Sequence, residues 1–194
     1  MKLTNEQQII KVLFKDFLSY YNSRSMSRAI GISHAGTFKI LKKLEKKEFV
    51  IGKRIGKAVV YSLNFGNPVL CREIETILTI EAQNCRRWLE EFRKLENSVN
   101  FAILFGSIIR DERTARDIDI LVVADKESYG DVKKIINERN QISNRKIHLI
   151  FQSPEEFKKD VSDRNKAIVE IIKTGIVLFG QDKIREAVSR DDRR

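Results

Sequence analysis

Hydrophobic positions in the first third of the chain follow a helical spacing three times and then alternate as they do in strands. Thr4, Ser25 and Ser33 are each placed to cap the start of a helix, and Gly31 is placed to end one. The third helix would bury a face made of Thr37, Ile40, Leu41 and Leu44. The pattern therefore predicts three helices and a two-stranded hairpin with a basic, glycine-containing turn, over residues 5–20, 25–31, 33–47 and 49–64.

One long helix is predicted next. Asn67 can cap its start and Pro68 suits its first position, and the apolar spacing continues to about Glu96. An apolar stripe of this length must be buried, either on the chain's own N-terminal domain or on a second copy, and we favour a homodimer. The stripe consists of Cys71, Ile74, Leu78, Cys85, Trp88, Phe92 and Leu95.

From residue 98 onward, short apolar runs alternate with amphipathic ones, which indicates a sheet covered by helices. Strands are predicted over residues 100–106, 117–125 and 145–152, and a last apolar segment over 176–180. Helices are predicted over residues 130–143, 153–162 and 164–175. We therefore expect an α+β protein divided into an N-terminal domain, a connecting helix, an α/β domain with a small mixed sheet, and a charged tail, over residues 1–66, 67–97, 98–184 and 185–194.

Charge is concentrated at the front of the chain. Residues 1–65 contain 13 lysines and arginines against four acidic residues, whereas the rest of the chain is almost neutral. A basic first domain favours an anionic partner, most simply double-stranded DNA. The alternative is a charged surface that serves only solubility.

The location expected from the sequence is the cytoplasm. The first ten residues are polar and do not resemble a signal peptide, and no apolar run is long enough to cross a membrane. Cys71 and Cys85 form neither a disulfide framework nor a metal-binding pattern, so we expect both to be reduced and buried.

The stretch "SMSRAIGISHAGTFKILKKLEKKEFVIGKRIGKAVVYSLN" resembles the winged-helix domains of prokaryotic transcription regulators. The resemblance covers about residues 1–65 and implies a winged helix-turn-helix fold that binds DNA. Glu48 departs from the pattern, because many relatives have a glycine at the end of the recognition helix.

The candidate DNA-binding residues lie off the apolar face of the third helix and on the hairpin. Short polar residues at the start of a recognition helix suit a major groove, and cations suit phosphates. The alternative is that the lysines only solvate the helix surface. The candidates are Ser33, His34, Lys39, Lys42 and Lys43 on the helix, and Lys53, Arg54 and Lys57 on the hairpin.

Two carboxylates open a buried strand in "FAILFGSIIRDERTARDIDILVVAD". Asp117 and Asp119 are two residues apart in a strand, so both point to the same face. Such a pair suits Mg²⁺ or Mn²⁺ together with phosphate oxygens of a substrate. Gly106 permits close approach of a ligand at the end of the preceding strand, and the Ser107 hydroxyl and free N–H groups suit a phosphate.

This stretch resembles the minimal nucleotidyltransferases of the DNA polymerase β-like superfamily, whose signature is Gly-Ser, about ten residues, and then Asp-x-Asp. The resemblance covers about residues 98–182 and includes "PEEF" and "IIKTGIVLFG". It implies a nucleoside triphosphate, with ATP the first choice, bound at Gly106 and Ser107, and a metal at Asp117 and Asp119.

Two positions depart from the nucleotidyltransferase pattern. His148 stands where the family has a third acidic residue; its imidazole could bind a divalent cation, act as a general base, or only fill a disused cleft. Asp111 stands where many relatives have glycine, and adds negative charge near the expected phosphates. Arg110, Arg113 and Arg116 would offset that charge and contact phosphate, or remain solvated.

Three functions fit these features. The first is a DNA-binding regulator whose second domain binds nucleotide and metal as a sensor, with slow transfer or none. The second is an active enzyme with Asp117, Asp119 and His148 in catalysis, moving a nucleoside monophosphate to a protein, RNA or small molecule. The third follows from the family resemblance: an antitoxin beside a separate helical toxin of the HEPN type.

Overall fold

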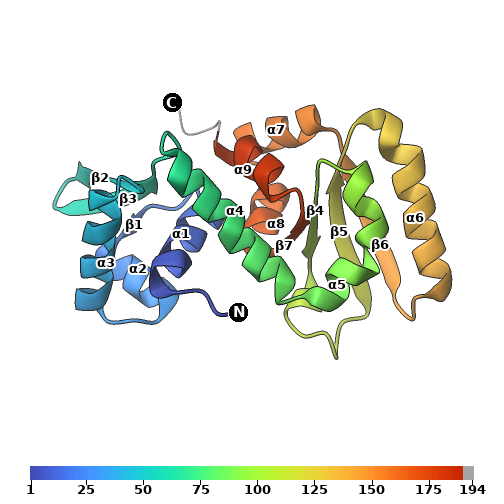
Figure 1. The fold of residues 1–194 in the computed structure, drawn as a ribbon, viewed down its shortest axis with the longest axis horizontal. Coiled ribbons are helices and arrows are strands. Elements are labelled where there is room, and N and C mark those ends of the chain that lie inside the picture. The colour runs from blue at the N-terminus through green and yellow to red at the C-terminus, as the bar shows by residue number, and fades with distance from the viewer. Residues whose placement is uncertain (190–194) are drawn as a thin grey trace. The chain divides into compact units, whose positions relative to one another are not determined.

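The computed structural model describes residues 1–189, which form two compact units. The first unit covers Met1–Ile80 and the second begins at Glu81, so the boundary falls inside one helix rather than at residue 66 or 98. Figure 1 labels the elements of both units.

The first unit contains four helices and a three-stranded antiparallel sheet of order β1-β3-β2. Its core includes Phe14, Met26, Leu41 and Leu44, each at most 1% exposed. The elements are α1 (Asn5–Lys15), β1 (Tyr21–Asn22), α2 (Ser23–Ile30), α3 (His34–Lys46), β2 (Val50–Ile55), β3 (Ala58–Leu63) and α4 (Pro68–Gln83).

The first helix ends earlier than predicted, at Lys15 instead of residue 20. Asp16 leaves helical geometry, and its carboxylate accepts hydrogen bonds from the Ser19 hydroxyl at 2.8 Å and the Tyr21 hydroxyl at 2.7 Å. These local bonds compete with continuation of the helix. Thr4 caps the start of α1 as predicted, in a reciprocal pair with Gln7.

Both ends of the next two helices are set by local hydrogen bonds. Asn22, not Ser25, caps α2, which ends at left-handed Gly31 as predicted. Ser33 caps α3 as predicted. After α3, Glu48 has a φ of 57° and the amides of Glu48 and Phe49 turn back to the last turn of the helix. This is the conformation that glycine usually supplies at the end of a helix.

The predicted helix over residues 67–97 is divided in three. Asn67 caps α4 as predicted, accepting from the amides of Val69 and Leu70, but α4 ends at Gln83. A bend at Cys85 separates it from α5 (Arg86–Glu91), and η1 (Arg93–Ser98) follows. An apolar spacing that keeps its period across the break concealed the two helix ends.

The second unit is built on a four-stranded mixed sheet, as predicted. The strand order is β6-β5-β4-β7, with β5 and β6 parallel and the other two pairs antiparallel. Its strands are β4 (Phe101–Phe105), β5 (Asp117–Val123), β6 (Lys146–Gln152) and β7 (Ile176–Phe179), and its remaining elements are η2 (Ser107–Ile109), η3 (Lys126–Ser128), α6 (Tyr129–Ile142), α7 (Pro154–Ser162), α8 (Lys166–Thr174) and α9 (Gln181–Ser189).

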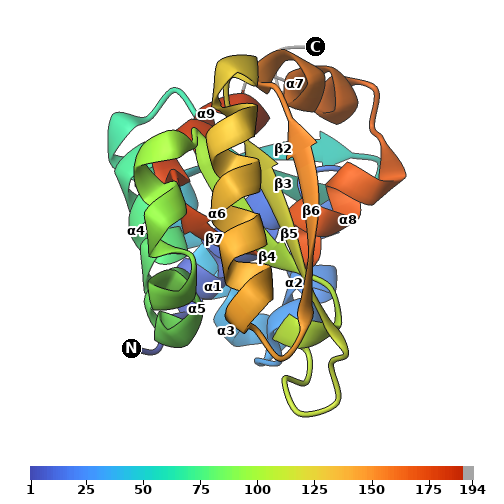
Figure 2. The same ribbon diagram turned by 90° about the vertical axis from the view of Figure 1, so that its right-hand side faces the viewer.

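One face of this sheet carries the core of the unit. Trp88 of α5, Phe92 at its C-terminal end and Ile136 of α6 form one hydrophobic cluster with Ile118 and Ile120 of β5. Figure 2 shows α6 lying along this face. The apolar stripe of the predicted dimer helix is therefore divided, because its second half belongs to this core.

The opposite face also carries buried residues, among them Ile103 and Leu121, each 0% exposed, but it is partly open at the Asp117 end of β5. Phe157 of α7 meets Phe101 edge-on, with ring centroids 4.8 Å apart, and Phe101 pairs with Val123 at the far end of β5 from Asp117. The amino-terminal end of β5 consequently keeps partly exposed polar side chains on this face.

Three smaller expectations are settled by the structure. Helix α9 continues to Ser189, so residues 185–189 are helical, while the remaining tail lies outside the described residues. Cys71 and Cys85 form no disulfide within residues 1–189 and are only partly buried, and Cys85 lies in the bend between helices. Among residues 1–189, no helix has both the length and the apolar character that a membrane span requires.

Candidate functional site

Asp117 and Asp119 lie at the start of β5. Their carboxylates project from the face of the sheet that α5 and α6 do not cover. Ile118 between them is 2% exposed and belongs to the core on the other face. The two acidic side chains are 38% and 24% exposed, so a ligand from solvent can reach them. The strand thus buries one side chain and presents its two neighbours, as the alternation predicted.

His148 joins these carboxylates through the register of the sheet. It lies on β6, parallel to β5 and directly paired with Asp119. Its Nδ1 is 3.4 Å from Asp119 Oδ1 and 3.6 Å from Asp117 Oδ2. All three residues were candidate site residues from the sequence, and the structure brings their side chains together.

The three side chains fit the donor set of a divalent cation. One ligand atom from each lies within 4.8 Å of the others. Oxygen ligands of Mg²⁺ lie about 2.1 Å from the ion, hence at most about 4.2 Å apart, so small side-chain rotations would suffice. Two carboxylates favour Mg²⁺ or Mn²⁺, and the imidazole moves the preference toward Mn²⁺ and other transition metals.

Gly106 lies against one of these carboxylates. Its backbone has a φ of 82° and a ψ of −153°, a region that side chains exclude. A Cβ atom placed there would lie 2.1 Å from Asp119 Oδ2. The sequence predicted Gly106 for approach of a ligand, and the structure adds that the glycine makes room for the Asp119 carboxylate itself.

Ser107 begins η2 immediately after this glycine. Because Phe105 pairs with Asp119, the Gly106-Ser107 turn begins beside the carboxylate cluster. Ser107 is partly exposed, and its carbonyl oxygen accepts from the amides of Arg110 and Asp111. The turn predicted to bind phosphate and the strand predicted to bind metal therefore lie at one place.

The charged residues after this turn differ in their surroundings. Arg110 is exposed and makes no ion pair within residues 1–189. The Asp111 carboxylate accepts from the Arg113 amide at 3.0 Å and from the Thr114 hydroxyl at 3.0 Å. Asp111 therefore holds the loop that leads to β5, which gives this carboxylate a structural role.

The N-terminal candidates are divided by their partners. Ser33 is occupied in capping α3, and the His34 ring lies 2.9 Å from the Ser23 hydroxyl. Lys42 pairs with Glu45, and Lys43 pairs with Glu6. Hydrogen bonding to Lys43, then the Lys47 contact, hold the pKa of Glu6 below its usual value against the opposing effect of burial.

The remaining cations are exposed. Lys39 lies on α3, and Lys53 and Lys57 lie on the hairpin of β2 and β3; none has an ion pair within the described part of the chain. Arg54 Nε donates to the Gly56 carbonyl at 3.3 Å, which shapes the turn. Lys39, Lys53 and Lys57 are thus the cations most available to phosphate.

A comparison with protein families places the second unit. Residues 88–184, half of the chain, match the family model described as polymerase beta, nucleotidyltransferase. The chain belongs to this family. Neither the comparison with curated proteins nor that with solved structures found a match.

The domain reaches further toward the N-terminus than the strand pattern indicated. Trp88, Phe92 and Leu95 form part of its core, and the family match also begins at residue 88. Their helical spacing was visible in the sequence, but it was assigned to the connecting helix. What separates them is the bend at Cys85, which no glycine or proline marks.

Proposed function

We propose that the second unit binds a nucleoside triphosphate, with ATP the first choice, together with Mg²⁺ or Mn²⁺. Asp117 and Asp119 would hold the cation, and Gly106 and Ser107 would receive the phosphates, with Arg110 in reach of solvent-facing oxygens. The observation that carries the proposal is the contact between the Gly106 turn and the Asp119 carboxylate. In this family, metal and triphosphate must meet at such a point.

Nucleotide binding with no transfer, or with transfer too slow to label an acceptor, is the activity that these residues favour. Mg²⁺ prefers oxygen ligands, and His148 supplies a nitrogen at the family's third acidic position. The cation would polarise the triphosphate, and the two aspartates would hold it in place. The chain would then act as a nucleotide sensor.

An active transferase is the second candidate, and one observation favours it. His148 Nδ1 lies 3.4 Å from Asp119, near enough to complete a three-ligand site or to take a proton from an acceptor hydroxyl. Such an enzyme would move a nucleoside monophosphate to a protein, RNA or small-molecule acceptor.

Calorimetry of ATP binding with Mg²⁺ tests the site. The wild-type chain should release or absorb heat, and Asp117→Ala with Asp119→Ala should abolish it. Asp125→Ala with Asp131→Ala removes two exposed acidic residues elsewhere and should bind as wild type. Absence of heat in the wild type would end the proposal.

Labelled ATP then separates the two candidates. Under the sensor hypothesis, no label is transferred to the chain or to added acceptors with either metal. Transfer that disappears in Asp117→Ala with Asp119→Ala would establish the enzyme instead.

We further propose that the first unit is a winged helix-turn-helix that binds double-stranded DNA through α3 and the β2–β3 hairpin. Its element order, its basic charge and the exposed Lys39, Lys53 and Lys57 support this. Lys39→Ala with Lys57→Ala should weaken DNA binding and reduce its salt dependence. Lys158→Ala with Lys166→Ala, in the second unit, is the control; equal effects of both pairs would exclude this face.

Two partners stay predictions. A homodimer would be seen by light scattering, although the stripe that suggested it is partly buried in the second unit. An antitoxin role requires a separate helical toxin of the HEPN type, and labelling of that chain with ATP would reveal the acceptor.

A further inference from the structure

A polar cavity lies in the second unit, away from the carboxylate cluster. Its volume is about 720 Å³, within the range of pockets that bind small molecules. The wall includes Ile118, whose side chain points to the opposite face of β5 from Asp117 and Asp119. A ligand in this cavity and a ligand at the carboxylate cluster would therefore bind on opposite faces of the sheet.

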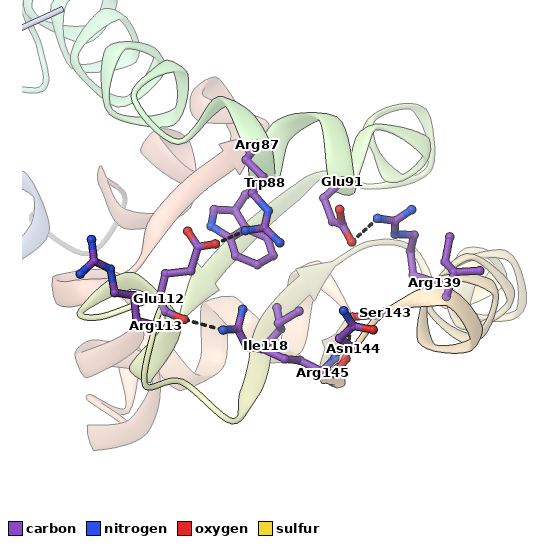
Figure 3. A pocket seen from close by; sticks show the side chains of 11 residues that line it. Arg87, Trp88, Glu91, Glu112, Arg113, Ile118, Arg139, Ser143, Asn144 and Arg145 are labelled. Carbon is purple, nitrogen blue, oxygen red and sulfur yellow. Dashed lines mark hydrogen bonds and ion pairs between the residues drawn. The ribbon is translucent and has the colours of Figure 1, made fainter.

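Arginine is the main polar residue of this cavity. Arg87, Arg113, Arg139 and Arg145 line it, whereas the acidic lining residues are Glu91 and Glu112. Figure 3 shows these side chains around the pocket. Two positive charges consequently have no carboxylate among the lining residues, an excess that matches one dianionic group.

The existing contacts orient the guanidinium groups without using all their donors. Arg87 and Arg139 pair with Glu112 and Glu91, and Arg145 Nη2 donates to the Glu112 carbonyl at 2.6 Å. The Nε of Arg139 is shielded from solvent and has no hydrogen-bond partner. Such a donor costs free energy until an acceptor reaches it.

Arg113 stands at the rim of the cavity with its guanidinium exposed and unpaired within residues 1–189. Across the cavity from Arg113, the lining offers the exposed amide of Asn144, and Ile142, which is 70% exposed, adds apolar surface. Forked arginine donors recognise phosphate oxygens in pairs. Apolar surface beside them suits the body of the same ligand.

We propose that this cavity binds a small phosphate-bearing ligand with a dianionic group, of about the size of a nucleotide. Arg113 and Arg145 contact the phosphate, and Ile142 and Asn144 contact the rest. The site is independent of the proposed triphosphate site, because it uses none of the same residues and no metal.

Trp88 gives a direct measurement. It is the only tryptophan of the chain, it lines the cavity, and the Arg87 guanidinium lies 4.9 Å from its ring centroid. A ligand that contacts the Arg87 guanidinium changes the surroundings of the Trp88 indole. Fluorescence of the full chain therefore reports occupancy of this cavity without any need for activity.

The experiment titrates pyrophosphate, ADP and a short single-stranded oligoribonucleotide into Asp117→Ala/Asp119→Ala protein in EDTA. Pyrophosphate and ADP should each change Trp88 fluorescence to saturation. In the same background, Arg113→Gln with Arg145→Gln should raise the half-saturating concentration by about ten-fold or more, since each loses a charged hydrogen bond. Arg93→Gln, an exposed arginine outside the cavity, should leave it unchanged.

Three results would overturn the proposal: no change with pyrophosphate or ADP, a change that persists in the Arg113→Gln/Arg145→Gln protein, or a response to the oligoribonucleotide alone. Because Arg145 also holds the Glu112 loop, Arg113→Gln by itself provides a variant that leaves every described contact of the fold intact. It should still weaken binding of pyrophosphate several-fold. ATP binding with Mg²⁺ by the otherwise wild-type chain is measured separately, so failure at one site is distinguishable from failure at the other.

Discussion

Gly106 and the Asp119 carboxylate occupy adjoining space, so that a single added carbon on the glycine would lie 2.1 Å from Asp119 Oδ2. Gly106 directly follows β4 and Asp119 lies on the neighbouring strand β5, where it pairs with Phe105. A turn suited to phosphate is thereby fixed against a group suited to metal. A glycine is therefore required at position 106 by packing against Asp119.

Gly106→Ala should therefore damage both the fold and the site. The backbone at Gly106 is in a region that costs side-chain-bearing residues about 1–3 kcal/mol, and the new methyl group displaces the Asp119 carboxylate. Urea unfolding should show a loss of that size, and calorimetry should show weaker binding of ATP with Mg²⁺. Gly130→Ala is the control, since a methyl group there meets nothing within 4 Å. Normal ATP binding by Gly106→Ala would show that Asp119 has no part in it.

Restoring an acidic residue at position 148 tests whether the histidine limits activity. In His148→Asp, three carboxylates converge and repel one another without a cation, so the melting temperature should fall in EDTA and recover with Mg²⁺. Transfer of label from ATP should rise if His148 is what limits transfer, as the sensor hypothesis holds. His148→Asn introduces a side chain of nearly the same shape as aspartate but without its charge, and should show neither effect. A rise in both variants would trace the change to loss of imidazole rather than gain of a carboxylate.

The ion pair between Glu6 and Lys43 is expected to restrain DNA binding. Glu6 also holds Lys47 at 3.0 Å, so Glu6→Gln releases two cations beside α3. Affinity for DNA should increase, and the slope of log K against log salt should steepen by about 1 for each new phosphate contact. The loss of stability should stay under about 1 kcal/mol because the pair is partly exposed. Glu96→Gln, an exposed carboxylate of the second unit, is the control for simple removal of negative charge.

Local sequence signals predicted most helices and strands of this fold. Ser33, Asn67 and Ser153 each cap the helix that they were expected to cap, and Pro154 lies in its first turn. The alternation at Asp117, Ile118 and Asp119 predicted correctly that the two carboxylates share one face of β5 and that Ile118 is buried on the other. These features depend on hydrogen bonds and side-chain directions within a few residues, so they can be predicted from a single sequence.

The parts that escaped prediction depend on contacts between distant residues or on bends without a marker residue. Cys85 interrupts a regular apolar spacing, and only the packing of Trp88 on the sheet shows where the next domain begins. The contact between Gly106 and Asp119 needs the strand register. The arginine cavity joins residues more than fifty positions apart, from Arg87 to Arg145, which no motif connects.

Tyr21 predicts how the first unit responds to alkaline pH. Burial, assisted by its hydrogen bond to Asp16, raises the pKa of the Tyr21 hydroxyl to about 12. In the unfolded chain the pKa is about 10, so this contribution to stability is complete below pH 10 and is lost as the pH rises toward 12. Tyr21→Phe should cost roughly 1 kcal/mol at pH 8. Its difference from wild type in urea unfolding should shrink between pH 10 and 12, whereas Tyr20→Phe, at an 81% exposed position, should follow wild type throughout. A difference that stays constant to pH 12 would show that the hydroxyl keeps no special pKa.

Glu48 offers a gain of stability that tests the end of α3. Its φ of 57° is unfavourable for a residue with a side chain by about 1–2 kcal/mol, and glycine avoids this at a cost of about 0.5–1 kcal/mol in chain entropy. The amides of Glu48 and Phe49 bond to the carbonyls of Glu45 and Leu44 through the backbone alone, so glycine would keep both bonds. Glu48→Gly should therefore raise the free energy of unfolding by roughly 0.5–1 kcal/mol in chemical denaturation followed by circular dichroism. Glu48→Ala keeps the left-handed strain and should give no such gain. If glycine and alanine behave alike, the backbone at this position is not left-handed, and the turn from α3 into the β2–β3 hairpin must have another geometry.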